Sequence, residues 1–431
     1  MAREMKDSGV AWIGEIPADW SIVKIKAGVH KVGSGKTPSG GATSYADEGV
    51  LFLRSQNVYD TGLELSNPTY ITPEVDEEMK GTRVFPNDVL LNITGGSIGR
   101  CCIFPESLET ANVNQHVSII RVDERVFLPE FMHYYWISPL GSMAINLYQT
   151  GGNREGMSAE AIKNTPIILM PLEEQKHICK VLDFKCAKID AVLDKTRASI
   201  EEYKKLKQAI ITQAVTKGIR GDRPMKKSGI EWIGSCPANW TIIRIKWLLE
   251  EGKDRSTEGT EEPLSMSQKY GILPTKEMDI VPNMASSFVG AKLVHKGDLV
   301  FNKLKAHLGV FAVSDYDGLV SPDYAVYRTT SLANAKYLEY LFKTPQYISE
   351  FKKKSTGIAA GLTRLYTEGL YSIFCALPPI EEQQEIVSYL QGETVAMDAL
   401  IQKKEQFLAE LETYKKSLIY EYVTGKKGVK F

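Results

Sequence analysis

The most constraining feature of this chain is an internal duplication of two of its segments. The segments Ser8–Trp20 and Ser228–Trp240 share the skeleton S-G-x-x-W-I-G-x-x-P-A-x-W. A second match has a different offset and carries Pro171–Thr216 onto Pro379–Thr424 without insertion or deletion. Internal repeats of this kind indicate duplicated structural units. The chain therefore runs through a constant leading segment, a variable part and a constant trailing segment, and then through all three again.

Each trailing segment predicts one long helix. A proline followed by two glutamates suits the first helical turn, and Gly218 and Gly425 stand where the helices should end. About 45 residues at about 1.5 Å each give a length of roughly 65 Å. Apolar residues recur near a spacing of 3.5 in both copies: Ile189, Leu193, Thr196, Ile200, Tyr203, Leu206 and Ile210, then Met397, Ile401, Leu408, Leu411, Tyr414 and Leu418.

So narrow an apolar stripe on so long a helix requires a partner helix, and the other copy in the same chain is the simplest partner. A whole domain connects the two copies, which favours antiparallel packing. The alternative is two independent core helices.

The variable parts predict mixed α+β domains. Short β-rich runs are punctuated by Gly, Pro and Asn; they are Val50–Leu53, Asp88–Ile93, His116–Ile120, Asp298–Phe301 and Tyr324–Tyr327. Helical stretches are expected near Pro129–Leu147 and Ala335–Lys353. The expected fold is α+β: two mixed α+β domains separated by two long antiparallel helices, which form an intramolecular coiled coil with a pseudo-twofold repeat. The expected boundaries are 1–168 and 219–376 for the domains with their leading segments, and 169–218 and 377–431 for the helices.

Composition limits the class of protein. The net charge of −1 is unusual for a DNA-binding protein, although Lys and Arg outnumber Asp and Glu between residues 171 and 227. No long apolar run and no signal-peptide pattern at Met1 are found, so a cytoplasmic protein is expected. The six cysteines form no C-x-x-C pair and have no histidine at zinc-ligand spacing, which favours apolar packing over a metal or a disulfide.

Catalytic motifs are incomplete. Gly33-Ser34-Gly35-Lys36-Thr37 is similar to a phosphate loop, but His30 occupies the position of the first required glycine, and Pro38 follows at once. Asn67-Pro68-Thr69-Tyr70 and Ser321-Pro322-Asp323-Tyr324 lack the second proline of the amino-methyltransferase motif, and no glycine-rich cofactor loop precedes either. The sequence therefore favours a non-catalytic protein.

The whole arrangement resembles the specificity subunit of type I restriction-modification systems. The motifs that carry the resemblance are Trp12-Ile13-Gly14 with Pro17 and Trp20, Trp232-Ile233-Gly234 with Pro237 and Trp240, Pro378-Pro379-Ile380-Glu381-Glu382-Gln383, and Gly35-Lys36-Thr37-Pro38-Ser39. The first copy departs from the pattern at Met170-Pro171, where the doubled proline is missing.

The resemblance implies a function. Each variable domain would be a target recognition domain that reads one half of a split, asymmetric site on double-stranded DNA. The helices would measure the unread spacer and would dock two modification subunits, which methylate adenine. Two restriction subunits would add translocation and cleavage. No cofactor is expected in this chain, since S-adenosylmethionine, ATP and Mg would belong to the partner subunits.

Base readout needs side chains that donate and accept hydrogen bonds, and phosphate contact needs cations and small polar groups. The candidate DNA-binding residues of the first domain are Ser34, Lys36, Thr37, Ser39, Arg54, Ser55, Gln56, Asn57, Asn92, Thr94, Ser97, Arg100, Asn153 and Arg154. Those of the second domain are Ser265, Ser267, Gln268, Lys269, Tyr270, Lys303, Lys305, His307 and Arg364. Asn112, Asn114 and Gln115 are equally compatible with turn chemistry. The alternative function is a coiled-coil scaffold whose two heads bind proteins.

Overall fold

A computed structural model describes residues 3–149, 156–268, 270–278, 287–359 and 362–428. The chain forms two compact units. The first unit comprises Met1–Arg197 with Gln406–Phe431, and the second unit comprises Ala198–Glu405. The division falls within the two long helices rather than at their ends, so each unit contains one α+β domain and part of both helices.

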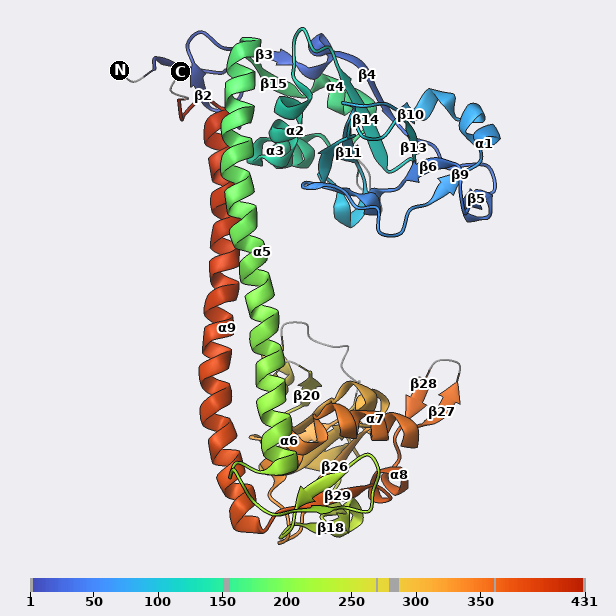
Figure 1. Cartoon of the computed structure of the whole chain (residues 1–431), viewed down its shortest axis with the longest axis vertical. Helices are drawn as coiled ribbons and strands as arrows, with labels where there is room; N and C mark the ends of the chain where they lie inside the picture. Colours follow the sequence, from blue (N-terminus) through green and yellow to red (C-terminus); the bar gives the residue numbers. More distant parts are fainter. Residues whose placement is uncertain (1–2, 150–155, 269, 279–286, 360–361, 429–431) are drawn as a thin grey trace. The chain divides into compact units, whose positions relative to one another are not determined.

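The long helices α5 (Leu172–Lys217) and α9 (Ile380–Val423) pack together and run antiparallel, as expected (Figure 1). In the first unit, Lys415 Nζ lies 2.6 Å from Asp190 Oδ1; in the second unit, Lys207 Nζ lies 2.6 Å from Asp398 Oδ1. The match between the two trailing segments aligns Asp190 with Asp398 and Lys207 with Lys415, so the two ion pairs are equivalent. Such reciprocal pairs are the expected result when two copies of one helix pack antiparallel.

Two residues of the predicted apolar stripe do not lie in the helix interface. Ile189, Leu193 and Ile200 are buried, whereas Leu206 is 49% exposed and Tyr414 is 54% exposed. The prediction for Leu206 and Tyr414 was wrong, because apolar spacing alone does not separate the seam from its neighbouring face. The two are repeat-equivalent, since the match of the trailing segments aligns one with the other.

Both helices end at the predicted glycines. Gly218 has φ of 80° and Gly425 has φ of 71°, a conformation that L-residues with a side chain rarely adopt. A Cβ atom at Gly425 would lie 2.4 Å from Pro17 Cγ, and one at Gly218 would lie 3.6 Å from the Trp240 ring. Each glycine therefore lets a leading segment pack against a helix end.

The first domain is built around a four-stranded antiparallel sheet and a five-stranded mixed sheet. The four-stranded sheet has the order β12-β11-β14-β4: Cys101–Ile103, Val89–Asn92, Val117–Val122 and Val29–Ser34. The five-stranded sheet has the order β10-β13-β6-β9-β5: Arg83–Val84, Ala111–Val113, Val50–Leu53, Tyr70–Ile71 and Tyr45–Ala46.

Shorter elements complete the first domain. The two-stranded pairs are β1 (Met5–Asp7) with β2 (Glu15–Pro17), β3 (Ser21–Lys24) with β15 (Pro166–Leu169), and β7 (Val58–Tyr59) with β8 (Gly62–Leu63). The α-helices are α1 (Pro73–Glu78), α2 (Pro129–Ile137), α3 (Pro139–Tyr148) and α4 (Ala159–Asn164). The 3-10 turns are η1 (Ile25–Gly28), η2 (Gly41–Ser44), η3 (Ser55–Asn57), η4 (Lys80–Thr82) and η5 (Gly95–Ser97).

The second domain contains a matching four-stranded antiparallel sheet. Its order is β24-β23-β26-β19: Phe311–Val313, Leu299–Asn302, Tyr324–Thr329 and Leu249–Glu251. The two-stranded pairs are β16 (Met225–Lys227) with β17 (Ser235–Pro237), β18 (Thr241–Arg244) with β29 (Phe374–Leu377), β20 (Leu264–Ser267) with β21 (Gly271–Pro274), β22 (Lys292–Val294) with β25 (Gly318–Val320), and β27 (Thr356–Ala359) with β28 (Leu362–Arg364). The helices and turns are α6 (Ala335–Phe342), α7 (Pro345–Lys354), α8 (Thr367–Tyr371), η6 (Ile245–Trp247), η7 (Thr275–Glu277) and η8 (Lys303–Leu308).

Each helical stretch predicted within a domain is divided into two helices. Ser138 separates α2 from α3, and Thr344 lies immediately before the first residue of α7. Both residues precede a proline, which disfavours helical backbone in the residue before it and begins a new helix well.

The leading segments are anchored by the same contacts in both units. The Trp20 indole donates to Glu174 Oε2 at 3.0 Å, and the Trp240 indole donates to Glu382 Oε1 at 3.2 Å. Arg3 also pairs with Glu174, at 2.7 Å. In the second unit, Arg223 pairs with Glu382 and thereby repeats this contact. Each glutamate lies in the first turn of a long helix, where the helix dipole also favours negative charge.

The next residue of each helix, a glutamine, fixes the loop that follows the central sheet. Gln175 is fully buried; it accepts from Leu128 N at 2.9 Å and donates to Val126 O at 2.8 Å. Gln383 makes the same two bonds with Asn334 N and Leu332 O, at 2.8 and 2.9 Å. The constant P-x-E-E-Q motif therefore joins the leading segment, the helix and the domain.

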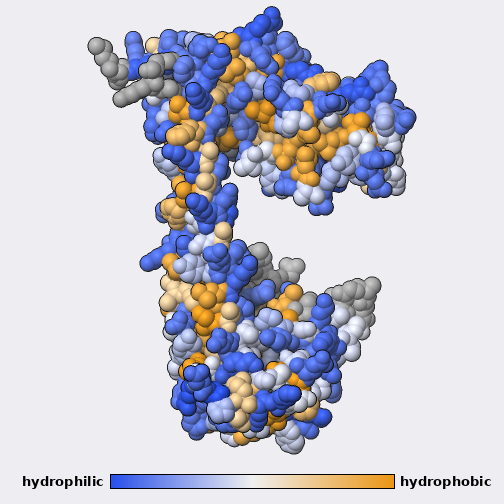
Figure 2. Space-filling model, in the orientation of Figure 1, coloured by the Kyte–Doolittle hydropathy of each residue, from blue (hydrophilic) through white to orange (hydrophobic). Residues whose placement is uncertain are grey.

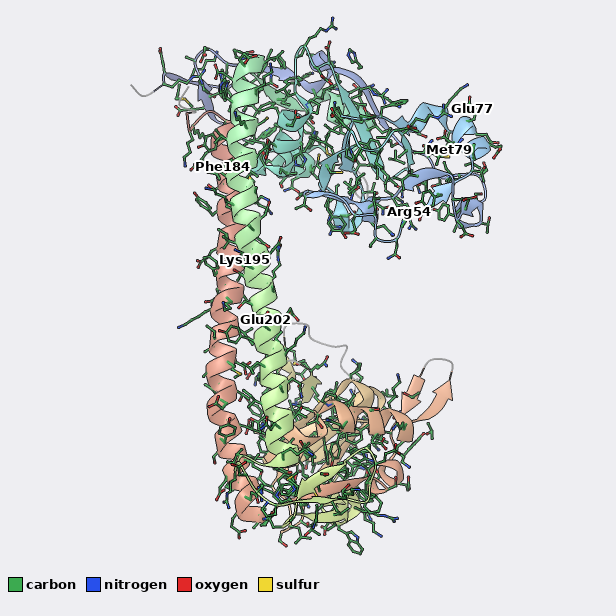
Figure 3. The ribbon with its side chains drawn as sticks, viewed as in Figure 1. Arg54, Glu77, Met79, Phe184, Lys195 and Glu202 are labelled. Atoms are coloured by element: carbon green, nitrogen blue, oxygen red, sulfur yellow. The ribbon has the colours of Figure 1, made fainter. Side chains whose placement is uncertain are left out.

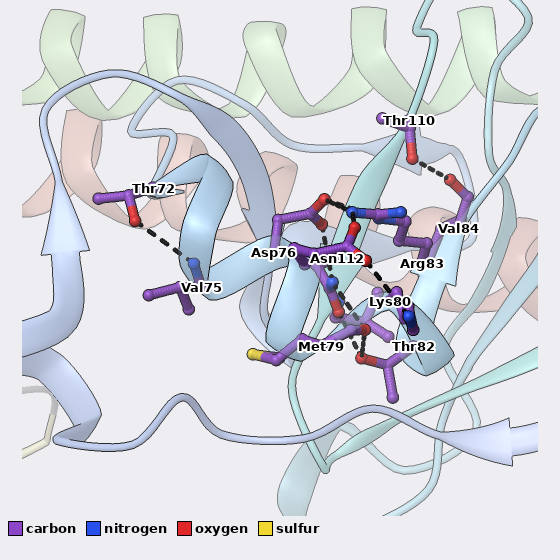
Figure 4. Close-up of polar contacts among 12 residues, drawn as sticks. Thr72, Val75, Asp76, Met79, Lys80, Thr82, Arg83, Val84, Thr110 and Asn112 are labelled. Atoms are coloured by element: carbon purple, nitrogen blue, oxygen red, sulfur yellow. Dashed lines mark hydrogen bonds and ion pairs between the residues drawn. The ribbon is translucent and has the colours of Figure 1, made fainter.

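A buried polar cluster joins α1 to strands β13 and β10 of the five-stranded sheet (Figure 4). Asn112 of β13 donates to Asp76 Oδ1 at 2.9 Å and accepts from Thr82 Oγ1 at 2.6 Å. Arg83 Nε donates to Asp76 Oδ2 at 2.7 Å. Asn112 is thus a structural strand residue rather than a turn residue.

One pair of core positions exchanges size between the two units. Gly28 faces Phe127: a Cβ atom at Gly28 would lie 2.4 Å from the Phe127 ring. The repeat-equivalent positions hold Leu248 and Ala333, which are both buried. The equivalence of Phe127 and Ala333 follows from the Gln175 and Gln383 contacts on either side of them. In the first unit the large residue, Phe127, stands at the second of the two positions. In the second unit the large residue, Leu248, stands at the first position.

The size exchange predicts non-additive stability effects. Gly28→Leu should destabilise the chain by about 1–3 kcal/mol through overpacking, and Phe127→Ala by about 3–5 kcal/mol through a cavity. The double variant should cost less than the sum by more than about 1 kcal/mol, because the new leucine fills the space that the phenylalanine leaves. Urea unfolding of all four proteins measures this coupling, and additive effects would contradict it.

The buried glutamate of the second anchor predicts an acid-dependent contribution. Burial opposes the charged form of Glu382, but hydrogen bonds from Arg223, Trp240 and Asn239 outweigh burial, so the pKa of Glu382 is lowered. Glu382→Gln should reduce the free energy of unfolding by about 1–3 kcal/mol at neutral pH. The lowered pKa gives stability that is present above the unfolded pKa of about 4.3 and is lost as the pH falls below it, so the difference from wild type should shrink there.

The matched control for this experiment is Glu381→Gln, since Glu381 is an exposed neighbour in the same helical turn. Equal losses of stability in both variants at neutral pH would contradict a specific role for Glu382.

Candidate nucleic-acid interface

Predicted DNA-binding residues of the first domain converge at one end of the four-stranded sheet. Ser34 ends β4, Asn92 ends β11, and Asn92 lies opposite Val117, the first residue of β14. The backbone N–H of Asn92 donates to Arg100 O at 2.8 Å, which places Arg100 at the same sheet end. Loops that are far apart in the sequence therefore lie together at one end of the sheet.

Hydrogen bonds between side chains join three of these loops. Thr37 donates to Gln115 Oε1, and Gln115 Nε2 lies 3.2 Å from His116 Nε2. His116 Nδ1 in turn lies 2.6 Å from Thr94 Oγ1. Sequence reasoning left Gln115 open between DNA contact and turn chemistry and did not select His116 as a DNA-binding residue. The signal that could have revealed them was their position at the start of the predicted strand His116–Ile120, since other selected polar residues also lie at the ends of predicted strands.

Two predicted residues are buried and hold the loops in place. Asn92 donates to Ser55 O at 2.8 Å and to Ser97 Oγ at 3.2 Å. Asn57 accepts from Arg54 N at 2.9 Å and donates to Glu64 O at 2.8 Å. In this conformation the side chains of Asn57 and Asn92 support the interface from beneath.

The other first-domain candidates differ in exposure. Arg54 is half-buried and donates to Thr69 Oγ1 at 2.8 Å, and the guanidinium carbon of Arg100 lies 4.4 Å from the Tyr59 ring centroid. Figure 3 labels Arg54 at the domain surface. Ser55, Thr94 and Ser97 are half-buried, and the exposed candidates are Ser34, Lys36, Thr37, Ser39 and Gln56. Gly35 between them touches the sheet: a Cβ atom there would lie 2.0 Å from Val113 O, so this loop requires glycine.

The second domain also brings candidates together at the matching sheet end. Gln268 donates to Leu308 O at 2.9 Å, and the backbone N–H of Leu365 donates to Lys303 O at 3.1 Å. Arg364 pairs with the carboxylate of Asp323. The loops that follow β20, β23 and β28 therefore meet, and Asp323 is a residue that sequence reasoning did not select.

Two serines of the second domain are structural. Ser265 Oγ lies 2.9 Å from Thr275 Oγ1, and Ser267 Oγ accepts from Tyr270 N at 2.9 Å. These bonds shape the β20–β21 hairpin, which presents Gln268 and Tyr270 at the surface. Asn153, Arg154 and Lys269 lie outside the described residues, as does the side chain of His307.

Positive charge at the second domain is partly buried. Lys292 and Lys303 lie 3.7 and 3.9 Å from the same Glu251 carboxylate oxygen. Burial lowers the pKa of Lys292, and the nearby charge of Lys303 lowers it further. One carboxylate therefore serves two ammonium groups, which leaves a net positive charge that suits an anion such as phosphate.

Two further observations concern the residues that the structure describes. They hold no group of three or more His, Cys, Asp and Glu that could bind a metal ion. None of the described helices is long and apolar enough to cross a membrane.

The fold and the site define a class of protein. Each unit carries an α+β domain on the same helix-anchored frame, and each domain gathers polar loops at one sheet end. Comparison with known proteins gives this class a family.

The family model described as type I restriction modification DNA specificity domain matches residues 17–202. A Methanocaldococcus jannaschii protein assigned as the MjaX specificity subunit of a type I restriction enzyme is 25% identical over 97% of this chain and 96% of its own length. The type I restriction enzyme EcoKI specificity subunit of Escherichia coli strain K12 is 20% identical over 96% of this chain and 90% of its own.

A solved chain, from a study of complex assembly and conformational transition of the type I R-M system, shares the fold. It has a TM-score of 0.70 and 16% sequence identity, over 96% of this chain and 99% of that chain. Residues 17–202 thus match the type I restriction modification DNA specificity domain, and the chain as a whole is similar to type I restriction-modification specificity subunits, the DNA-binding and non-catalytic components of these systems.

The exposed lysines of the interface predict a salt effect. Lys36→Ala and Lys305→Ala should each weaken DNA binding and reduce the slope of log affinity against log salt by about one, because each lysine would release one counterion. Fluorescence anisotropy of a labelled duplex DNA titrated with the protein at several salt concentrations measures this slope. Lys226→Ala, at an exposed position of β16 just before the constant leading segment, is the control. An unchanged slope in the first two variants would remove these lysines from the interface.

Proposed function

We propose that this chain reads a bipartite, asymmetric DNA site, with one half-site for each recognition domain, and docks modification and restriction subunits. One observation carries the proposal: the contacts that anchor each domain are the same in both units, whereas the polar side chains at the sheet end differ. Identical anchors suit identical partners, and different side chains suit different half-sites.

DNA explains the sheet ends better than a protein partner does. The described candidates are mostly hydroxyl, amide and cationic groups, which are the groups that contact phosphates and base edges. The centres of protein–protein interfaces are instead enriched in aromatic residues and depleted of lysine and serine. The coiled-coil scaffold with protein-binding heads is therefore the weaker reading.

Repeat-equivalent apolar residues on the helices suit two copies of one partner. Val192 and Leu400, which the match of the trailing segments aligns, are 43% and 36% exposed. Leu206 and Tyr414 form a second such pair. Figure 2 shows apolar side chains at the helix surface, and Figure 3 labels the exposed Phe184 on α5 with Lys195 and Glu202 further along it. We assign the two apolar pairs, Val192 with Leu400 and Leu206 with Tyr414, to the docking of two modification subunits.

The remaining roles would fall to the partner subunits. Two modification subunits would carry S-adenosylmethionine, and two restriction subunits would use ATP and Mg. The helices α5 and α9 would set the length of the unread spacer, and the complex would act in the cytoplasm, where it reaches the genome.

Exchange of one recognition domain tests the proposal. Replacing residues 20–165 with the corresponding part of another specificity subunit should change one half of the methylated site and leave the other half unchanged. Mapping methylated adenines in a host that expresses the complex measures the outcome. A change in both halves would refute one half-site per domain, and a wild-type complex that methylates no split site would refute the function.

Charge substitution on the helices tests the docking surface. Leu206→Glu with Tyr414→Glu should reduce co-purification of the modification subunit at least tenfold, because a carboxylate would have to be buried against the partner. Thermal unfolding of the chain should be unchanged, since both side chains are exposed. Lys195→Glu with Glu202→Lys is the matched control at exposed polar positions. Full co-purification of the first variant would place docking elsewhere.

A further inference from the structure

The central hairpins of the two domains share one backbone frame. A gap-free alignment carries β11 and β12 onto β23 and β24 with an identical register: Leu90 pairs with Cys102, and Val300 pairs with Ala312. The frame continues into the connecting turn. Asn92 N donates to Arg100 O at 2.8 Å, and Asn302 N donates to Val310 O at 3.2 Å.

The turns of these hairpins have equal length and end alike. Gly99 has φ of 90° and Gly309 has φ of 70°, and both are separated from the strand-end asparagine by six residues. We name residues 93–98 and 303–308 the hairpin turns. Their sequences are Ile-Thr-Gly-Gly-Ser-Ile and Lys-Leu-Lys-Ala-His-Leu.

A second turn at the same sheet end also shares its frame. In the first domain, His116 N donates to Asn114 Oδ1 at 3.1 Å and Val117 N donates to Asn114 O at 3.1 Å. In the second domain, Asp323 N donates to Ser321 Oγ at 3.4 Å and Tyr324 N donates to Ser321 O at 3.0 Å. We name residues 114–116 and 321–323 the strand-leading turns.

Each strand-leading turn is bonded to a different partner. His116 lies against Thr94 of the hairpin turn, whereas Asp323 pairs with Arg364 of β28. Gln115 is exposed at this turn in the first domain, and Lys305 is exposed at the hairpin turn in the second. The strand register and the contacts that close the turns are shared, but the functional groups exposed there are an amide in one domain and an ammonium in the other.

The opposite end of the same hairpin behaves differently. There, Phe85 N donates to Asp88 Oδ2 at 2.8 Å, and His295 N donates to Asp298 Oδ2 at 2.8 Å. Asn87 and Gly297 both have positive φ, at 72° and 95°. The same aspartate bond is present at this end in both domains, although their sequences differ. This end of the hairpin is therefore structural.

We infer that the hairpin turn and the strand-leading turn form the specificity-determining element of each domain, at equivalent places on their two half-sites. The inference rests on the proposed function and deepens it. An exposed glutamine can bond an adenine edge through two hydrogen bonds, whereas lysine suits guanine or phosphate. In the first domain, Gln115 is the reading residue and His116 is its positioning residue.

A graft within the chain tests this inference. Residues 93–98 and 114–116 are replaced by the sequences of 303–308 and 321–323, while Asn92 and Gly99 are kept. The chain is expressed with its modification subunits, and methylated adenines are mapped across the host genome. The first half of the site should change, with at least a tenfold loss of preference at one base pair, and the second half should stay the same.

The matched control is a graft at the structural end, in which residues 85–87 take the sequence of 295–297. It should leave both halves of the site unchanged. An unchanged site in the first graft, or an equal change in the control, would overturn the inference. A wild-type complex without a split site would instead refute the proposed function.

Point variants keep the test independent of folding. Gln115→Ala removes an exposed side chain and should relax the preference at one base pair of the first half-site by about tenfold. His116→Ala should give a similar but smaller effect, and His116→Gln, which can still bond Thr94, should restore part of the preference. Wild-type preference in Gln115→Ala would overturn the reading role.

Discussion

Each half of this molecule depends on the contact between a buried tryptophan and the first turn of a long helix. The indole of Trp20 or Trp240 donates to a glutamate that an arginine also neutralises, and the next helical residue is a buried glutamine that fixes a loop of the domain. A buried carboxylate is costly unless it is paired and hydrogen-bonded, so these partners are needed together. The leading segment, the helix and the domain therefore become one cooperative structure in each unit.

This anchor explains how two dissimilar domains share one architecture. The anchoring residues stand in the constant segments, while the side chains that face solvent at the sheet end stand in the variable parts. Because the anchor is satisfied without those surface side chains, the surface can diverge without loss of the fold. Asn92 and Asn302 end the equivalent strands β11 and β23, but their side chains make different bonds. Asn92 bonds Ser55 and Ser97, whereas Asn302 caps the turn that follows it.

Much of this fold was predictable from the repeat and from local patterns. The strand predicted at Val50–Leu53 matches β6, and the ends of α5 and α9 lie beside the predicted glycines. The division of Pro129–Leu147 into two helices was signalled by Pro139 but was not predicted. The exposure of Leu206 and Tyr414 could not be derived, because a spacing of 3.5 identifies a stripe and not its edges.

The candidate site was less accessible to sequence reasoning. The convergence of Thr37, Gln115 and Thr94 depends on non-local strand register, which one sequence does not specify. The burial of Asn57 and Asn92 likewise follows from tertiary contacts that no spacing reveals. Which candidates touch DNA stays a prediction.

The reversal of large and small residues at Gly28 and Phe127, compared with Leu248 and Ala333, limits how genes for such chains can recombine. A crossover between residues 28 and 127 that joined equivalent halves of the two copies would pair leucine with phenylalanine or glycine with alanine. The offspring would inherit a clash or a void at the centre of a domain. Productive exchange would therefore have its breakpoints in the constant segments, so that new specificities spread as whole domains.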